Sequence, residues 1–335
     1  APRCPIRARA ALADLRGAGR ALPNQAMLIR ALLLQEARLS SEIENIVTTN
    51  DALYQALSRD QWEEHPHVKE VLRYGDALRR GMDRLQEGRP LAATLFREIV
   101  SVIKGSDLPF RDLPGTAIVN DMTKEVIYTP PVGRDRIVAL LDDLAEFYHS
   151  DSDLDPLIKM AIAHYQFEAI HPFSDGNGRT GRVLNLLFLV QAGLLDVPVI
   201  YMSRKILEDK GAYYRGLLAV TRDGAWEEWI LYLLNVVTET AIDTRRRMEE
   251  IVAAMERATM VARSQAPRVY SRELVETIFS QPYTRIATLV ERRLGHRDTA
   301  ASHLRKLEEI GLLESLVLGR DKLYANVELM RILAG

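Results

Sequence analysis

The twelve residues HPFSDGNGRTGR, from His171 to Arg182, combine side chains that a simple turn does not need. His171 titrates near neutral pH and can take a proton from a hydroxyl group. Asp175 offers a hard carboxylate oxygen, which suits a Mg²⁺ ion shared with a nucleotide phosphate. Arg179 and Arg182 are three residues apart, so on a helix both reach the same side, and a guanidinium fork matches phosphate oxygens.

The glycines of this stretch lie between the charged side chains. Gly176, Asn177 and Gly178 leave the backbone bare and allow positive φ, so their amide groups can form a nest for an anion. A helix that begins near Gly178 adds its positive end at the same place. Capping and packing explain any one of these residues, but the combination predicts a phosphoryl- or nucleotidyl-transfer site. A Walker loop is excluded because it requires Gly-Lys-Ser/Thr, and one His with one Asp does not make a zinc site.

Helical segments flank the loop on both sides. Residues 155–170 keep apolar side chains on one stripe and run into the histidine. Residues 183–195 form the longest apolar run, which is shorter than a membrane span of ~20 residues and predicts a buried helix. Residues 27–47 are also helix-like, and 223–258 predict one long helix or two shorter ones. The fold class is therefore expected to be mostly α.

One segment breaks the helical pattern, TAIVNDMTKEVIYTPPV at residues 116–132. Two short β-favouring runs, TAIV and EVIYT, flank the polar turn NDMTK, and Pro130 and Pro131 end the segment. This pattern predicts a small β-hairpin, which must pack on the rest of the protein because an isolated hairpin is marginally stable.

The chain changes character after about Pro267. Three helix-like pieces precede two strand-like runs around the turn GRD, a pattern that resembles a winged helix-turn-helix. Residues 268–335 carry 11 Lys and Arg against 9 Asp and Glu, a weak basic excess for a DNA-binding domain. DNA binding and a role in protein interaction or dimerisation both stay open. The basic residues that could face a groove are Arg297, His303, Arg305 and Lys306.

The overall composition is that of a globular protein. Of the 335 residues, 47% are hydrophobic and 27% are charged, and the net charge of −2 gives no strong attraction to nucleic acid or membrane. The single cysteine, Cys4, excludes an internal disulfide framework and fits a reducing compartment. The first twenty residues have no continuous apolar core, so no secretory signal is expected. We predict a cytoplasmic protein with no membrane partner.

The stretch HPFSDGNGRTGR matches, without gaps, the signature HPF-x-D/E-GNGR-x-x-R and thus resembles the Fic family. Fic proteins are helical enzymes that mostly transfer AMP from ATP to a hydroxyl of a target protein. The resemblance implies His171 as the base and Asp175 as the Mg²⁺ ligand. It places the α- and β-phosphates on Gly176, Asn177, Gly178 and Arg179, and the γ-phosphate on Arg182, within a nucleotide-binding stretch that also includes Thr180 and Gly181. Phe173 would be a core anchor.

The resemblance extends to two further segments. The hairpin looks like the family's flap, whose residues Ala117, Ile118 and Val119 would pair with the backbone of the target. In DKGAYYRGLLAV, Tyr213 and Tyr214 would line the adenine pocket, although packing between helices explains them equally well. Many relatives carry Asn seven residues after the second tyrosine, where this chain has Thr221.

The upstream segment SSEIENI, Ser40 to Ile46, is on its own a polar helix face. Beside a Fic signature it fits the family's inhibitory pattern Ser/Thr-x-x-x-Glu-Gly/Asn through Ser40, Glu44 and Asn45. The resemblance implies that Glu44 pairs with Arg182 and occupies the γ-phosphate position. It covers most of residues 25–240.

Together these observations predict a mostly α protein with a Fic-type helical core and a small β-hairpin flap, followed by a winged helix-turn-helix domain. The predicted parts are an N-terminal helical region (1–100), a catalytic core (101–260) and the C-terminal module (267–335). The predicted activity is autoinhibited AMP transfer from ATP, with Mg²⁺, to a Ser, Thr or Tyr hydroxyl of an unidentified target protein or of the chain itself.

Several alternatives to this activity stay open. One is hydrolytic removal of AMP, with Glu44 positioning water, and another is transfer of phosphate or UMP. A third is a DNA-binding regulator whose Fic core senses a nucleotide. A DNA or protein partner for residues 267–335 and a homodimer also remain open.

Overall fold

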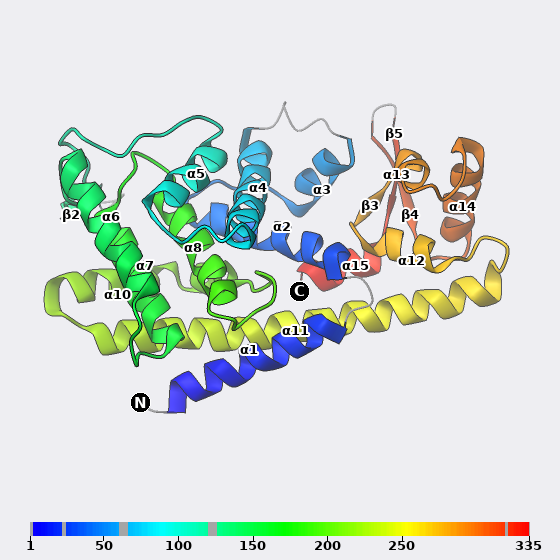
Figure 1. Ribbon diagram of the computed structural model, residues 1–335. Coiled ribbons are helices and arrows are strands. Elements are labelled where there is room, and N and C mark those ends of the chain that lie inside the picture. Colours follow the sequence, from blue (N-terminus) through cyan, green and yellow to red (C-terminus); the bar gives the residue numbers. More distant parts are fainter. Residues whose placement is uncertain (1–2, 22–24, 60–65, 120–125, 319–320, 335) are drawn as a thin grey trace.

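The computed structural model describes residues 3–21, 25–59, 66–119, 126–318 and 321–334 (Figure 1). These residues form a mostly helical protein with two small antiparallel sheets. The N-terminal helices are α1 (Arg3–Ala21), α2 (Gln25–Ile43), α3 (Asn50–Arg59), α4 (Pro66–Gln86) and α5 (Ala93–Lys104). The central elements are β1 (Ile118–Val119), β2 (Val126–Tyr128), α6 (Arg134–His149), α7 (Pro156–Ile170), α8 (Asn177–Gln191), α9 (Met202–Glu208), α10 (Lys210–Asp223) and α11 (Trp226–Gln265). The C-terminal elements are α12 (Arg272–Phe279), β3 (Tyr283–Thr284), α13 (Ile286–Glu291), α14 (Arg297–Glu309), β4 (Glu314–Leu318), β5 (Asp321–Ala325) and α15 (Val327–Ala334).

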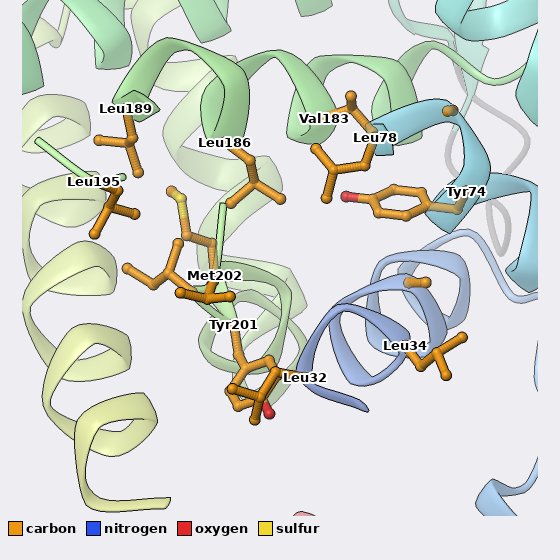
Figure 2. Close-up of a cluster of buried hydrophobic side chains, with 14 of the residues drawn as sticks. Leu32, Leu34, Tyr74, Leu78, Val183, Leu186, Leu189, Leu195, Tyr201 and Met202 are labelled. Atoms are coloured by element: carbon orange, nitrogen blue, oxygen red, sulfur yellow. The ribbon is translucent and has the colours of Figure 1, made fainter. Parts of the chain in front are cut away.

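Helix α8 lies at the centre of the core, as its apolar sequence predicted. Nearly every residue from Val183 to Leu189 is fully buried, and α8 packs against α2, α4, α5 and α7. Figure 2 shows side chains of α2, α4 and α8 meeting in one apolar cluster that also includes Tyr201 and Met202 at the start of α9. Helix α2, which leads to the Ser40–Ile46 segment, is thus part of the same core as the loop at 171–182.

The two helices around the loop begin and end at residues suited to those positions. Asp155 caps α7 by accepting a hydrogen bond from the Leu157 amide at 2.8 Å, and Pro156 occupies the first turn. Helix α7 ends at His171, which has φ 47°, and α8 begins after Gly176, which has φ 81°. These left-handed residues turn the chain from one helix into the next, and both predicted helices are confirmed.

Helix α11 settles the alternative for residues 223–258, because Trp226 to Gln265 form one continuous helix of 40 residues. At 1.5 Å per residue this helix is about 60 Å long. It runs beneath the central helices and reaches the C-terminal module, with α1 lying along it (Figure 1). Residues 100 and 260 lie inside α5 and α11, and the division into three parts stays a prediction.

The C-terminal module contains the helices and the strand pair that the sequence predicted. Its three strands form an antiparallel sheet in the order β3-β5-β4, packed beside α12, α13 and α14. Residues 319–320 of the predicted GRD turn lie outside the described residues. Strand β3 and helix α15 were not foreseen, and α15 packs back onto α11 and α2.

Two sequence predictions need adjustment. The helix predicted over 27–47 ends at Ile43, because Asn45 adopts a left-handed φ of 62°. The predicted hairpin is present as β1 and β2, with Ile118 opposite Tyr128, but its NDMTK turn lies outside the described residues. None of the described helices is long and apolar enough to cross a membrane.

Candidate active site

His171 lies at the C-terminal end of α7, where its amide donates to the Phe167 carbonyl at 3.0 Å. Burial, together with the positive charge of Arg111, lowers the pKa of the His171 imidazole below its ordinary range. The ring is therefore neutral at neutral pH, which is the form that accepts a proton. Its Nδ1 atom is buried and has no hydrogen-bond partner within the described residues.

Arg111, which the sequence analysis missed, fixes the backbone around His171. Its Nε donates to the His171 carbonyl at 2.6 Å, and Nη2 donates to the Ile170 carbonyl at 3.2 Å and the Pro131 carbonyl at 3.1 Å. Since Pro131 follows the hairpin, one buried guanidinium holds both the histidine and the hairpin exit. The Tyr128 hydroxyl adds a bond to the Ala169 carbonyl at 2.8 Å, so the hairpin is anchored beside the loop.

Asn177 closes the loop from within. Its Oδ1 accepts from the Phe173 amide at 2.9 Å and its Nδ2 donates to the Phe173 carbonyl at 2.8 Å. Phe173 is fully buried and stacks on Phe110, as expected of a core anchor. The Asn177 side chain is thus engaged by the loop itself, and its backbone amide is the group left to face an anion.

The start of α8 is the place where the sequence predicts an anion nest. The first amide groups of a helix have no acceptor within that helix and carry its positive end. A Cβ at Gly178 would lie 2.3 Å from Oε1 of Glu44 and 3.0 Å from Nη1 of Arg182. The bare backbone at Gly178 therefore allows a carboxylate to sit directly against the helix start.

Asp175 and Arg179 belong to a charge network at the edge of the loop. Lys104, at the end of α5, donates to Asp175 at 2.5 Å and to Glu70 at 3.0 Å. Arg179 is buried and donates to Glu70 and, at 3.3 Å, to Asp175. Burial alone would raise the pKa of Asp175, but the bond from Lys104 and the nearby positive charges outweigh it, so that pKa is lowered. Asp175 is therefore an ionised and partly exposed carboxylate.

Glu70 and Lys104 were also missed by the sequence analysis. They lie on α4 and α5, 109 and 71 residues away in sequence from the residues they contact. Neither stands in a pattern that marks it, so no sequence signal could have found them.

Arg182 is the point where the loop meets the upstream segment. Its side chain is only 2% exposed, and it donates through Nε to Ser40 Oγ at 2.8 Å. Its Nη2 donates to the Ser40 carbonyl at 2.8 Å and to Oε1 of Glu44 at 2.9 Å. Burial lowers the pKa of Arg182, but Glu44 and other neighbours outweigh it and the guanidinium stays charged. The structure thus places Ser40, Glu44 and Arg182 together.

Asn45 determines where α2 stops. The Ile46 amide donates to the Ser41 carbonyl and the Asn45 amide to the Glu42 carbonyl, each at 3.0 Å. With Asn45 left-handed, this is a Schellman motif, which favours Gly or Asn at that position. The Asn that follows Glu44 therefore ends the helix and presents the Glu44 carboxylate to α8. We call residues 40–46 the 40–46 turn.

Buried titratable groups surround Arg182 on its inner side. Gly181 permits close packing with α7, since a Cβ there would lie 2.4 Å from Oε1 of Glu168. Burial raises the pKa of Glu168 to about 8, although the charge of Arg182 opposes it. Thr180, also on α8, is fully buried, so Thr180 and Gly181 face the protein interior.

The two tyrosines of α10 have different surroundings. Tyr213 is 1% exposed, shares a 2.8 Å hydrogen bond with Nε2 of His164, and packs against Trp229. These contacts are those expected if Tyr213 packs between helices, which was the alternative to lining an adenine pocket. Tyr214 is 42% exposed, and its ring lies under the Lys210 ammonium at 5.9 Å. Thr221 shares a 3.1 Å hydrogen bond with the Tyr165 hydroxyl.

The carboxylates near the loop suit a shared Mg²⁺ rather than a metal held by protein alone. No cluster of three or more His, Cys, Asp or Glu that could hold a metal occurs in the part of the chain that the structure describes. Mg²⁺ commonly takes one or two carboxylates and completes its shell with phosphate oxygens and water. The exposed, ionised Asp175 beside the start of α8 fits that role.

Three protein-family profiles match this chain. The Fic/DOC family profile matches residues 90–189, and the Fic/DOC family N-terminal profile matches residues 4–83. A third profile, described as the C-terminal domain of SoFic-like protein adenylyltransferase, matches residues 254–329. The chain belongs to the Fic/DOC family.

Two proteins named as protein adenylyltransferases are similar to this chain over short segments. Protein adenylyltransferase fic-1 of Caenorhabditis elegans is 37% identical over 89 residues, which are 26% of this chain and 16% of that protein. The probable protein adenylyltransferase aq_aa38 of Aquifex aeolicus is 43% identical over 58 residues, 17% of this chain and 18% of the relative. The matched regions thus span less than a fifth of each of these relatives.

Solved structures share the fold over a much larger part of the chain. A Fic family protein from Desulfovibrio desulfuricans has a TM-score of 0.61 at 19% identity and covers 96% of this chain and 95% of its own. Fic-1 of C. elegans (residues 134–508 of that protein) has a TM-score of 0.56 at 20% identity, covering 76% and 73%. At these identities the likeness concerns the fold.

Proposed function

We propose that the chain is a protein adenylyltransferase that transfers AMP from ATP to a hydroxyl side chain of a target protein or of itself. The observation that carries this proposal is the meeting of a neutral His171, a bare helix start and the buried Arg182 within one loop. A base, an anion nest and a fixed cation are the groups that nucleotidyl transfer requires. The names of the relatives, which are similar over short segments, support this activity.

In the proposed reaction, the His171 imidazole accepts the proton of the target hydroxyl. The oxygen then bonds to the α-phosphorus of ATP, the bond from that phosphorus to the bridging oxygen breaks, and pyrophosphate leaves. Backbone amides at the start of α8 would hold the α- and β-phosphates, with Arg179 beside them. A Mg²⁺ ion at Asp175 would offset phosphate charge. Arg111 keeps His171 in place throughout, because it holds the carbonyls of residues 170 and 171.

We further propose that the 40–46 turn inhibits this reaction. Glu44 lies 2.9 Å from Arg182 and against Gly178, so its carboxylate takes the two groups that a γ-phosphate would use. Bound ATP would then be displaced, and its α-phosphate would be misaligned for in-line attack. The Glu44 side chain is 31% exposed. Its ion pair with Arg182 can therefore open without unfolding the core.

The test compares initial rates of label transfer to protein for the parent, Glu44→Gly, Arg182→Ala and the double variant. Label from α-labelled but not γ-labelled ATP, confirmed by mass spectrometry, identifies AMP transfer. Glu44→Gly should be faster by about tenfold or more, as expected for a charged hydrogen bond worth ~1.5–3 kcal/mol. Arg182→Ala should abolish transfer even in the Glu44→Gly background. A Glu44→Gly variant no faster than the parent would remove the inhibitory role.

Two readouts separate other reactions from AMP transfer. Label from γ-labelled ATP would indicate phosphate transfer, and loss of pre-attached AMP would indicate removal with Glu44 positioning water. The rest of the predicted machinery stays a proposal as well, including the pairing of residues 117–119 with target backbone and adenine contacts through Tyr214.

The C-terminal module is proposed to bind a macromolecule, either DNA or a protein. Several of its basic side chains are paired, Lys306 with Glu309 at 3.0 Å and Lys322 with Glu308 at 3.1 Å, which lowers the basic character of this face. Gel-shift binding with Arg297→Ala and Arg305→Ala, neither of which is buried, would reveal a DNA partner. Deleting the module is a poor test, because removal of α15 would leave buried Arg247 without two acceptors.

A further inference from the structure

A cavity of about 300 Å³ lies between four helices away from the loop. Its walls come from α2 (Gln35, Arg38), α9 (Arg204), α11 (Arg247) and the C-terminal end of α15. In Figure 1, α15 lies between α2 and α11, so residues from both ends of the chain meet there. We call this space the α2–α15 cavity. Its volume is at the lower end of the range for small-ligand sites.

The lining of the α2–α15 cavity is rich in arginine. It includes three arginines, Arg38, Arg204 and Arg247, against one carboxylate, Glu208. The carboxylates that face these arginines are Glu42, 2.7 Å from Arg38, and Asp243, 2.8 Å from Arg247 and 3.5 Å from Arg204, while Glu208 lies 3.8 Å from Arg204.

Two guanidinium groups keep unused donors despite these pairs. Arg247 is 1% exposed and donates to Asp243 and to the carbonyls of Ile332 and Leu333, yet its Nη2 is buried without a partner in the described residues. The Nε atom of Arg38 is likewise buried and has no hydrogen-bond partner among the described residues. An unsatisfied buried donor on a charged group is costly, and a rotation of either guanidinium that turned its donor toward an anion in the cavity would relieve that cost.

The remaining walls are apolar or aromatic. Leu39, Leu207 and Leu333 line the cavity, together with Tyr201, whose ring lies 5.9 Å from the Arg247 guanidinium carbon. Guanidinium forks match phosphate and carboxylate oxygens, and the leucines suit a short hydrocarbon part. The structure assigns to the α2–α15 cavity a small organic anion that carries a phosphate or carboxylate group.

The cavity also shares a helix with the 40–46 turn. Arg38 and Leu39 immediately precede Ser40, which accepts a hydrogen bond from Arg182. Glu36, on the same helix, accepts hydrogen bonds from the Ser203 amide at 3.1 Å and its hydroxyl at 2.5 Å, which joins α2 to α9. A bound anion would tie α2 to α9, α11 and α15, and so hold the 40–46 turn on α8. The resulting slower AMP transfer rests on the proposed function.

The binding test is calorimetric titration of the full chain with phenyl phosphate, with neutral benzyl alcohol as the control. Benzoate and inorganic phosphate, titrated separately, show which anionic group and how much of the apolar part are recognised. Phenyl phosphate or benzoate should bind and benzyl alcohol should not. Arg204→Gln, at a partly exposed position, should weaken binding on the order of tenfold, the usual effect of losing a charged hydrogen bond.

Arg245→Gln is the matched control, because Arg245 lies on α11, which also lines the cavity through Arg247, but Arg245 itself pairs with Glu249 at 3.3 Å and does not line the cavity. Its affinity should equal that of the parent. Equal affinities for Arg204→Gln and Arg245→Gln would overturn the assignment, since binding would then occur elsewhere, for example at the phosphate nest of α8. The assignment would also be overturned if neither phenyl phosphate nor benzoate bound to the parent protein.

Coupling to the 40–46 turn is measured by hydrogen exchange of the Glu44, Asn45 and Ile46 amides. Phenyl phosphate should slow their exchange in the parent and leave it unchanged in Arg204→Gln, and unchanged exchange in the parent would overturn the coupling. Neither measurement needs AMP transfer, so both remain informative if the proposed function fails. If AMP transfer is confirmed, the anion should slow the parent but not Glu44→Gly.

Discussion

The loop at 171–182 and the 40–46 turn that covers it are held in place by different kinds of contact. The loop is fixed through its backbone, since Arg111 holds the carbonyls of His171 and of the preceding Ile170, and Asn177 holds the amide and carbonyl of Phe173. The turn is folded by its own backbone bonds but is joined to the loop by hydrogen bonds to the guanidinium of Arg182. In the proposed function a competing anion replaces Glu44, whereas the bonds of Asn177 stay within the loop. We therefore expect the loop to behave as a rigid component and the turn as a releasable one.

The sharpest test of the rigid component is removal of its base. His171→Ala in the Glu44→Gly background should lower the initial rate of AMP transfer by ~10²–10⁴-fold, the usual contribution of a positioned base. Nucleotide binding, measured by calorimetry, should stay close to that of Glu44→Gly, because the helix start is unchanged. A nearly normal transfer rate would remove His171 from the mechanism.

Asn177→Ala should show how strongly the loop depends on its internal bonds. It leaves the buried Phe173 amide and carbonyl without partners, which costs about 2–6 kcal/mol at ~1–3 kcal/mol per group. Denaturant unfolding measures this loss. Asn185→Ala is the matched control, since the buried amide of Asn185 has no partner among the described residues and its removal should cost less. Equal losses for both variants would contradict a closing role for Asn177.

Asn45 should tune the releasable component without touching Glu44. Asn45→Ala puts, at a left-handed φ of 62°, a residue that tolerates this conformation less well than Asn, which costs roughly 1–2 kcal/mol at most and should loosen the turn. AMP transfer should rise several-fold. Asn45→Gly tolerates the same φ and should keep the parent rate, which makes it the control. If both variants transfer AMP at the parent rate, the left-handed residue does not position Glu44.

The smallest effect is expected from pH. Burial and Arg111 lower the pKa of His171, so its neutral form persists to a lower pH than that of an ordinary histidine. In Glu44→Gly, kcat/KM for AMP transfer should be flat around neutral pH and fall only below the ordinary value of about 6.5. A fall that begins above that value would show that another group, or a raised pKa, controls the rate.

Several parts of the molecule could be read from the sequence because their signals are local. Apolar periodicity located α7, α8 and α11. The spacing of the loop residues predicted a phosphate site that includes Arg182, and this stays a prediction. The pairing of Glu44 with Arg182 was implied by the resemblance to the Fic family rather than by a local signal, and the structure places the two side chains 2.9 Å apart. Asn45 carried an overlooked signal, since Asn near a helix end favours the left-handed conformation that stops α2 at Ile43.

The missed features depend on contacts between distant segments. Arg111 stands in an irregular loop, and only folding brings it under residues 170 and 171. Lys104 and Glu70 likewise reach the loop through the packing of α4 and α5 on α8. The docking of α15 on α2 could not be expected from a module predicted to be separate, because packing across two chain ends leaves no periodic trace.

The missing side chain at Gly178 has a consequence for how this chain can evolve. The same bare backbone receives the Glu44 carboxylate and, in the proposed reaction, the phosphates of ATP. A side chain at this position would exclude both the Glu44 carboxylate and the phosphates. A mutation of Gly178 therefore cannot relieve the proposed inhibition and keep the proposed activity. Selection can adjust the strength of the proposed inhibition only through residues 40–45 and through residues that shift α2. Drift is therefore expected to be slow at Gly178 and faster along α2, where lineages can vary their regulation and leave the chemistry intact.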